Sequence, residues 1–96
     1  MKFLVTMEIA EPPADTRSEL LTKEAERASE LAAQGHLIKL WRIQGRWANA
    51  GIWSASGVEE LNSVLDSLPL RPWMTVSVSA LEPHPNDPER TEAAQE

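Results

Sequence analysis

The chain has 96 residues, 42% of them hydrophobic and 25% charged, with a net charge of −6 and no cysteine. This composition is typical of one soluble globular domain, and it excludes disulfides, thiolate metal sites and cysteine nucleophiles. The acidic balance argues against nucleic acid or an anionic membrane as a partner, because both bind basic surfaces. No apolar run approaches the roughly 20 residues that span a bilayer, and the first residues do not form a signal peptide, so we expect a cytoplasmic protein.

The first third of the chain predicts a β-strand followed by a long helix. Every second residue at the start is apolar: Phe3, Val5, Met7 and Ile9. This period of two predicts a strand, which residues 11–13 (Glu-Pro-Pro) end. Residues 16–19 (Thr-Arg-Ser-Glu) form a capping-box pattern and Gly35 is a typical C-terminal glycine, so we expect a helix between them.

The next residues predict a hairpin, a second helix and a last strand. The β-rich residues 36–43 and 47–53 flank a short turn, Gln44-Gly45-Arg46, as in a hairpin. A second capping box at residues 56–59 precedes apolar residues at helical spacing: Val58, Leu61, Leu65 and Leu68. Residues 74–80 alternate again and predict the last strand.

The order β-α-β-β-α-β predicts an α+β, ferredoxin-like two-layer sandwich with a four-stranded antiparallel sheet. We expect this single domain to cover residues 1–82. Residues 83–96 are expected to form a proline-rich, acidic C-terminal tail, either disordered or laid over a neighbouring subunit.

The second predicted strand is apolar on both sides, although the two helices of such a fold cover only one face of the sheet. Ile38 and Leu40 are expected on one side, and Leu37, Trp41 and Ile43 on the other. A second copy of the chain is the simplest cover for the remaining face, so we expect a homo-oligomer built from dimers.

One carboxylate of the first helix, Glu24, falls where an apolar residue is expected. At about 100° per residue it lies inside the apolar stripe of the helix, formed by Leu20, Leu21, Ala25, Ala28, Leu31 and Ala32. The other charged residues lie on the outer face: Glu19, Lys23, Glu26, Arg27 and Glu30. Glu24 therefore pairs with a buried arginine such as Arg42, reaches out past the small alanines, or acts as a general acid/base with a raised pKa.

Three of the four tryptophans, Trp41, Trp47 and Trp53, lie in the predicted hairpin. They either wall an apolar pocket with indole N–H donors, or they pack in the core and in a dimer interface. Arg42 and Arg46 flank the turn, where an arginine either binds a substrate carboxylate through a forked pair of hydrogen bonds or is simply solvated. Arg42 is the stronger candidate because it lies within the strand.

Neither histidine predicts a metal site. His36 and His84 have no second histidine or carboxylate at metal-ligand spacing. His36 follows the helix C-terminus, where the helix dipole favours a cation. No dinucleotide-binding, phosphate-loop or Ser–His–Asp motif stands out, so we expect no cofactor.

Residues 40–49 (Leu-Trp-Arg-Ile-Gln-Gly-Arg-Trp-Ala-Asn) resemble the signature of the muconolactone Δ-isomerase family. Residues 68–74 (Leu-Pro-Leu-Arg-Pro-Trp-Met) and His84-Pro85 resemble it too, and the likeness runs from the Phe3 strand to His84. The resemblance implies a ferredoxin-like fold assembled into dimers and, in characterised members, a homodecamer. It also implies the cofactor-free conversion of muconolactone to 3-oxoadipate enol-lactone in the β-ketoadipate pathway of bacterial catechol degradation.

Glu24 aligns with the helix-one glutamate of the family, its proposed acid/base. We take as candidate substrate-binding residues Arg42, Trp41, Trp53, Asn49 and His36. The chain departs from the family pattern at Ala25, where a lysine commonly follows the glutamate, and at Leu37 and Ile38, which replace aromatic or basic residues.

The implied reaction agrees with the residues. A 1,3-proton shift in an unsaturated lactone needs one base, donors for the dienolate oxygen and a cation for the side-chain carboxylate. Glu24, a tryptophan N–H or backbone amide, and Arg42 are the candidates for these roles. Two alternatives stay open: the same scaffold acting on a different small molecule, and a non-catalytic oligomeric ligand-binding protein in which Glu24 pairs with an arginine.

Overall fold

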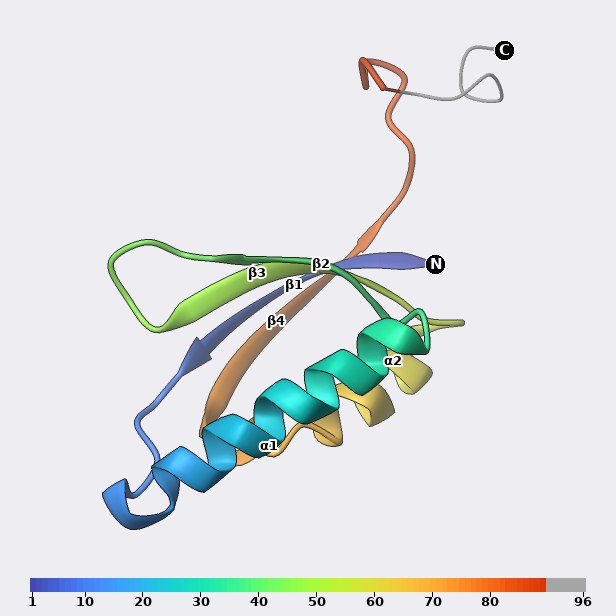
Figure 1. Cartoon of the computed structure of the whole chain (residues 1–96). Coiled ribbons are helices and arrows are strands. Elements are labelled where there is room, and N and C mark those ends of the chain that lie inside the picture. Colours follow the sequence, from blue (N-terminus) through green and yellow to red (C-terminus); the bar gives the residue numbers. More distant parts are fainter. Residues whose placement is uncertain (90–96) are drawn as a thin grey trace.

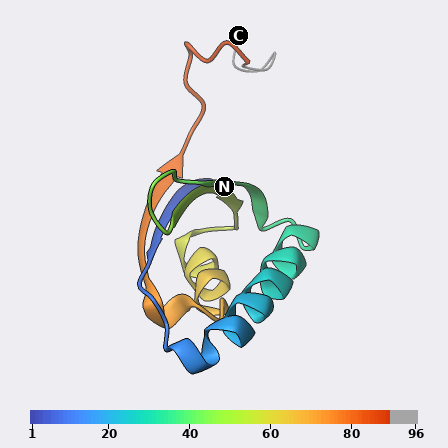
Figure 2. The ribbon, with the colours of Figure 1, turned by 60° about the vertical axis from the view of Figure 1, so that its left-hand side comes forward.

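The computed structural model describes residues 1–89 and shows the predicted β-α-β-β-α-β order (Figure 1). The elements are β1 Lys2–Ile9, α1 Ala14–Ala33, β2 Leu37–Arg42, β3 Ala48–Ser54, α2 Val58–Asp66, the 3₁₀ turn η1 Arg71–Trp73 and β4 Met74–Leu81. The four strands form one antiparallel sheet in the order β2-β3-β1-β4. Both helices lie on the same face of this sheet (Figures 1 and 2), which confirms the ferredoxin-like sandwich.

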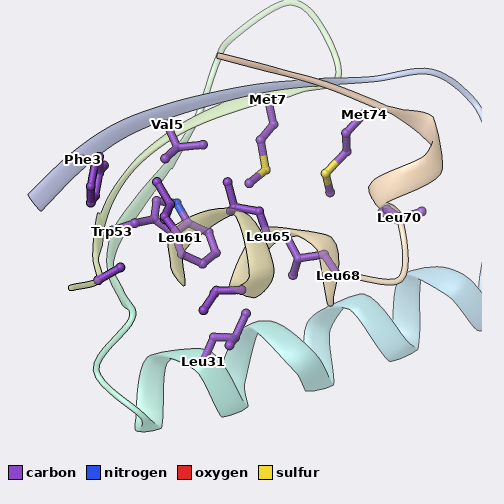
Figure 3. Close-up of a cluster of buried hydrophobic side chains, with 12 residues drawn as sticks. Phe3, Val5, Met7, Leu31, Trp53, Leu61, Leu65, Leu68, Leu70 and Met74 are labelled. Atoms are coloured by element: carbon purple, nitrogen blue, oxygen red, sulfur yellow. The ribbon is translucent and has the colours of Figure 1, made fainter. Parts of the chain in front are cut away.

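The core fills the space between the sheet and the two helices (Figure 3). Phe3, Val5 and Met7 of β1 are buried, as their alternation predicts, and Trp53 of β3 lies opposite Phe3. Helices and loops close the core from the other side with Leu31, Leu61, Val64, Leu65, Leu68 and Leu70. The side of the sheet that carries Phe3, Val5 and Met7 is called the covered face below, and the other side the open face.

Neither helix begins with the predicted capping box. α1 begins directly after Pro13, and the Thr16 hydroxyl donates to the Pro13 carbonyl instead of accepting from a helical N–H. A proline is tolerated there because the first N–H groups of a helix have no intrahelical partner. At the start of α2, the backbone N–H of Ser56 donates to Glu60, one residue beyond the predicted position. Gly35, with φ of +86°, follows the end of α1 as predicted.

α1 presents a different stripe to the core from the predicted one. Leu31 is buried, and Leu20, Glu24 and Ala28 are half-buried, as expected. Three predicted core residues are exposed instead: Leu21, Ala25 and Ala32. Arg27, predicted on the outer face, is half-buried because its guanidinium finds a hydrogen-bond partner at the end of α2. The buried stripe is therefore rotated toward Arg27, and Glu24 stays within it.

A β-bulge in β2 changes which of its side chains share a face. The pairing with β3 shifts between Leu37 and Lys39, so Ile38 is an extra residue in the strand. Leu40 then lies opposite Gly51 and joins Leu37 on the covered face. The prediction that placed Leu37 and Leu40 on opposite sides is wrong, because the alternation restarts after the extra residue.

The bulge also determines where Trp41 and Arg42 lie. Arg42 is opposite Asn49 on the covered face, whereas Trp41 is opposite Ala50 on the open face. Lys39 shares the open face and places its ammonium 5.6 Å from the centre of the Trp41 ring. Arg42 can therefore contact a ligand on the covered face, whereas the Trp41 ring lies on the open face.

Beyond β4 the chain leaves the sheet and runs away from the domain (Figure 1). The structure describes the predicted tail as far as Glu89, and residues 90–96 lie outside the described residues. Within residues 1–89, no helix is both long enough and apolar enough to cross a membrane.

Candidate active site

Glu24 lies in the middle of α1, half-buried on the side that faces the core. Its Oε1 accepts a hydrogen bond of 2.9 Å from the backbone N–H of Leu70. Burial raises the pKa of the Glu24 carboxyl, and the Leu70 N–H opposes the rise because it stabilises the charged form. Burial is the larger effect, so this carboxyl holds a proton more tightly than an exposed glutamate. A carboxyl with a raised pKa is a stronger base than an exposed glutamate, which suits general acid/base chemistry.

The Leu70 N–H can bind Glu24 because Leu70 lies between the end of α2 at Asp66 and the start of η1 at Arg71. Leu68 and Leu70 both point into the core (Figure 3), so the backbone between them is fixed against α1 and α2. η1 begins only after Leu70, whose carbonyl accepts from Trp73 while its N–H is not part of a helix. Sequence reasoning missed this donor, since a backbone N–H carries no side-chain signal.

Glu24 does not pair with an arginine in the described part of the chain. Within residues 1–89 neither Glu24 nor Arg42 takes part in an ion pair. Arg42 is exposed at the end of β2, where its guanidinium is available to an anionic ligand. Within this part of the chain, the contact of the Glu24 carboxylate is therefore a backbone N–H and not an arginine.

A hollow of about 270 Å³ lies at the end of the hairpin that β2 and β3 form. Its lining residues are Leu40, Trp41, Arg42, Trp47, Ala48 and Asn49. It thus brings together three of the predicted binding residues, Trp41, Arg42 and Asn49, with indole surface beside a guanidinium. Glu24 does not line it, so the predicted site residues form two groups, one on α1 and one on the hairpin.

Two polar atoms of β3 are buried without a hydrogen-bond partner among residues 1–89: Oδ1 of Asn49 and Nε1 of Trp53. Both side chains lie on the covered face, because Asn49 is opposite Met7 and Trp53 is opposite Phe3. Leaving such a group unpaired costs about 1–3 kcal/mol. A ligand that supplies the missing partner would recover this cost, so both atoms mark polar positions beside the core.

Gly51 explains how the Trp53 indole reaches its position. A Cβ at Gly51 would lie 2.7 Å from the Lys39 carbonyl oxygen, 3.0 Å from Leu40 and 3.2 Å from the Trp53 Nε1. The first distance is too short for any side chain, because the Lys39 carbonyl belongs to the backbone of the neighbouring strand. A glycine here therefore lets β2 lie close and leaves the Trp53 N–H beside a bare backbone.

Neither the two histidines nor Arg46 lines the hairpin hollow. Nδ1 of His36 is 2.9 Å from the Ser54 carbonyl oxygen, at the opposite end of β2 from Arg42. Arg46 is exposed and lies 3.9 Å from Glu8. Nδ1 of His84 accepts from the backbone of Asn86. Within residues 1–89, no three His, Cys, Asp or Glu side chains are grouped as metal ligands.

Comparison with known proteins identifies the family to which this chain belongs. The family model described as "Muconolactone delta-isomerase" matches residues 1–87. The Muconolactone Delta-isomerase of Acinetobacter baylyi is 36% identical, over 90% of this chain and 93% of the relative, and that of Pseudomonas putida is 36% identical, over 90% and 88%. A crystal structure of muconolactone isomerase aligns with a TM-score of 0.84 at 33% identity, covering 95% of this chain and 98% of the other.

A more distant structure shares the fold alone. The 5-chloro-2-hydroxyhydroquinone dehydrochlorinase of Burkholderia phenoliruptrix aligns with a TM-score of 0.68 at 14% identity, over 85% of this chain and 94% of the other. The two sequence relatives, by contrast, are 36% identical over 90% of this chain, which is enough to place it in their family. This chain belongs to the muconolactone Δ-isomerase family and is an isomerase.

Proposed function

We propose that the protein converts muconolactone to 3-oxoadipate enol-lactone by a 1,3-proton shift in which Glu24 carries the proton and no cofactor takes part. The substrate is supported by the names of the relatives that match most of the chain. The observation that carries the mechanism is the half-buried Glu24 carboxyl, whose Oε1 is bound to Leu70.

Glu24 has the geometry of a shuttling base. Oε1 is engaged by the Leu70 N–H, while Oε2 has no hydrogen bond to any of residues 1–89, which leaves it for the substrate. Oε2 takes a proton from the activated carbon, the electron pair moves into a dienolate, and the same proton returns two carbons away. The double bond moves, Glu24 is regenerated and no redox change occurs. A raised pKa favours the first step, because it makes the carboxylate a stronger base, and the protonated carboxyl then returns the proton to the more basic dienolate carbon.

The developing oxyanion needs a donor, and Trp53 supplies the best-placed indole N–H. Its Nε1 has no hydrogen-bond partner among residues 1–89 and lies on the covered face, the same side of the sheet as α1. Trp41 faces the opposite side, so its role is proposed to be packing against substrate or a second copy at the hairpin hollow. A donor fixed in a dry site stabilises a developing charge more than the same donor does in water.

Arg42 is the proposed partner of the substrate carboxylate. It lies beside Asn49 on the covered face, and both residues line the hairpin hollow. A guanidinium binds a carboxylate through two parallel hydrogen bonds, which fixes orientation as well as charge. His36 retains only Nε2 for a substrate, since its Nδ1 lies at the Ser54 carbonyl.

Ala25 does not weaken this assignment. Its side chain is exposed, while that of the preceding Glu24 turns toward the core. A lysine at this position, common in the family, would also extend from the exposed side of α1.

We infer further that the protein is cytoplasmic and works as a homo-oligomer of dimers, up to the decamer implied by its family. Exposed large apolar side chains support a second copy on the open face and on the outer side of α1: Leu4, Leu21, Ile38, Trp41 and Leu81. A second copy that covers the hairpin would also dry the hollow that holds Arg42.

The test is turnover of racemic muconolactone, followed by formation of the enol-lactone. We expect the wild type to be active and Glu24→Gln to lose about 10²–10⁴-fold in kcat, because the amide cannot take the proton. Glu26→Gln is the matched control, since Glu26 is exposed on the same helix, and it should keep wild-type kcat. Turnover that survives in Glu24→Gln would overturn the role of Glu24, and an inactive wild type would overturn the substrate.

A further inference from the structure

Arg27 connects α1 to the segment that binds Glu24. It lies one turn beyond Glu24 on the same helix, and its Nε donates to the Ser67 hydroxyl at 3.0 Å. The Ser67 hydroxyl in turn donates to the Val64 carbonyl at 2.6 Å, in the last turn of α2. Arg27 also pairs with Glu30 at 2.9 Å, which holds the guanidinium from the other side. The guanidinium is therefore held through two of its nitrogens, Nε by Ser67 and Nη1 by Glu30.

Two hydrogen bonds from α1 meet the same short segment, residues 67–70. The Arg27 side chain donates to the hydroxyl of Ser67, the first residue of this segment. The Glu24 carboxylate accepts from the backbone N–H of Leu70, the last residue. Leu68 and Leu70 bury their side chains in the core, so the segment cannot move without disturbing the packing. The hydrogen bonds of Arg27 and Glu24 join this segment to α1 at its two ends.

We infer that Arg27 is a positioning residue for Glu24: through Ser67 it holds the Leu70 amide against Oε1 and so leaves Oε2 as the oxygen that carries the proton. This inference rests on the proposed role of Glu24 in catalysis. The helical pattern predicts Arg27 on the outer, solvated face, whereas in the structure it is half-buried and bonded to Ser67.

The arginines of the surrounding elements pair with other carboxylates, except Arg42, which forms no ion pair within residues 1–89. On α1, Arg17 pairs with Glu11 and Arg27 with Glu30; after α2, Arg71 pairs with Asp66; on the sheet, Arg42 lies at the end of β2. None of them forms an ion pair with Glu24 within residues 1–89.

The hydrogen bond from the Leu70 N–H is the contact that lowers the pKa of the Glu24 carboxyl. Because this N–H stabilises the carboxylate, losing it raises the pKa further. A base works in its charged form, so the acidic limb of the activity profile moves to higher pH.

The experiment compares Arg27→Met, Ser67→Ala and the double variant, with Lys23→Met as the matched control. Lys23 also forms an ion pair on α1, with Glu19, but it is exposed and does not contact Ser67. The measurements are kcat/KM for muconolactone against pH, and the pKa of the Glu24 carboxyl from ¹³C NMR titration, assigned by its loss in Glu24→Gln.

We expect each single variant to move the acidic limb and the NMR pKa upward by about one pH unit, with kcat lowered more than KM is changed. The double variant should show no further shift, because both substitutions break one connection. Lys23→Met should match the wild type. If Arg27→Met does not fold, Ser67→Ala still tests the connection, since it leaves the Arg27 side chain and its pair with Glu30 in place.

An unchanged NMR pKa in Ser67→Ala, or shifts that add in the double variant, would overturn the inference. The two proposals fail separately. If Glu24→Gln stays active while the NMR pKa shifts as expected, the catalytic role of Glu24 is wrong and the connection through Ser67 stands. If Glu24→Gln is inactive and the NMR pKa does not shift, only the role of Arg27 is wrong.

Discussion

The two helices cover the same face of the sheet, yet they bury very different shares of their residues. α2 buries three of its nine residues, Leu61, Val64 and Leu65, whereas over residues 14–33 α1 buries only Leu31. α2 therefore supplies stability through close packing. α1 packs loosely enough to direct a carboxylate and a guanidinium inward, Glu24 and Arg27, which a dense core would exclude. We therefore propose that α2 mainly stabilises the fold and that α1 carries the reacting carboxyl.

The largest stability effect should come from α2. Leu61 has no exposed surface, so Leu61→Ala removes its packing and leaves a cavity in the centre of the core. We expect the free energy of unfolding to fall by about 2–5 kcal/mol, measured by urea denaturation. Leu21→Ala makes the same chemical change on α1, where Leu21 is 41% exposed, and should cost no more than about 0.5 kcal/mol. Equal losses in the two variants would remove the contrast between the helices.

Much of this contrast is visible in the sequence. The order of elements and the inward position of Glu24 follow from hydrophobic periodicity, because a charge inside an apolar stripe stands out on a helical wheel. The exact stripe of α1 does not follow. Whether Arg27 or Ala25 turns inward depends on Ser67, which lies forty residues after Arg27 and meets it only in the folded chain.

The hairpin shows the same limit for strands. Nothing in the sequence marks Ile38 as the extra residue of a bulge, so the faces predicted for Leu40 and Trp41 relative to Leu37 are wrong. The donor that Leu70 offers to Glu24 is a backbone N–H, which every residue except proline carries. The sequence thus predicts that the Glu24 carboxylate points inward. The N–H that binds it and the bulge at Ile38 can be located only in the folded structure.

A smaller effect separates two substitutions at Glu24. Glu24→Gln keeps an oxygen that accepts from the Leu70 N–H, whereas Glu24→Leu leaves this N–H without its acceptor. We expect Glu24→Leu to be less stable than Glu24→Gln by about 1–3 kcal/mol, the usual cost of a buried donor that loses its partner. Urea denaturation of both variants at one pH measures the difference. Equal stability, or a more stable leucine variant, would mean that α1 tolerates any residue here and that the contact with Leu70 adds nothing to folding.

The smallest effect is the dependence of the protein's stability on pH that Glu24 should cause. Burial raises the pKa of Glu24 above its ordinary value of 4.5. The folded state therefore binds this proton more tightly than the unfolded state. The resulting stabilisation is fully present below the unfolded pKa and is lost as the pH rises through the folded pKa, a sign opposite to that of a salt-bridged carboxylate.

Glu24→Gln lacks this titration. Its free energy of unfolding relative to the wild type should therefore rise as the pH increases above about 4.5 and level off beyond the raised pKa. Glu26→Gln, exposed on the same helix, should show no such trend. Urea unfolding of the three proteins across this pH range measures it. A difference between Glu24→Gln and the wild type that is constant, or that shrinks as the pH rises, would show that Glu24 is solvated in the folded state, and α1 would then present no buried acid to a substrate.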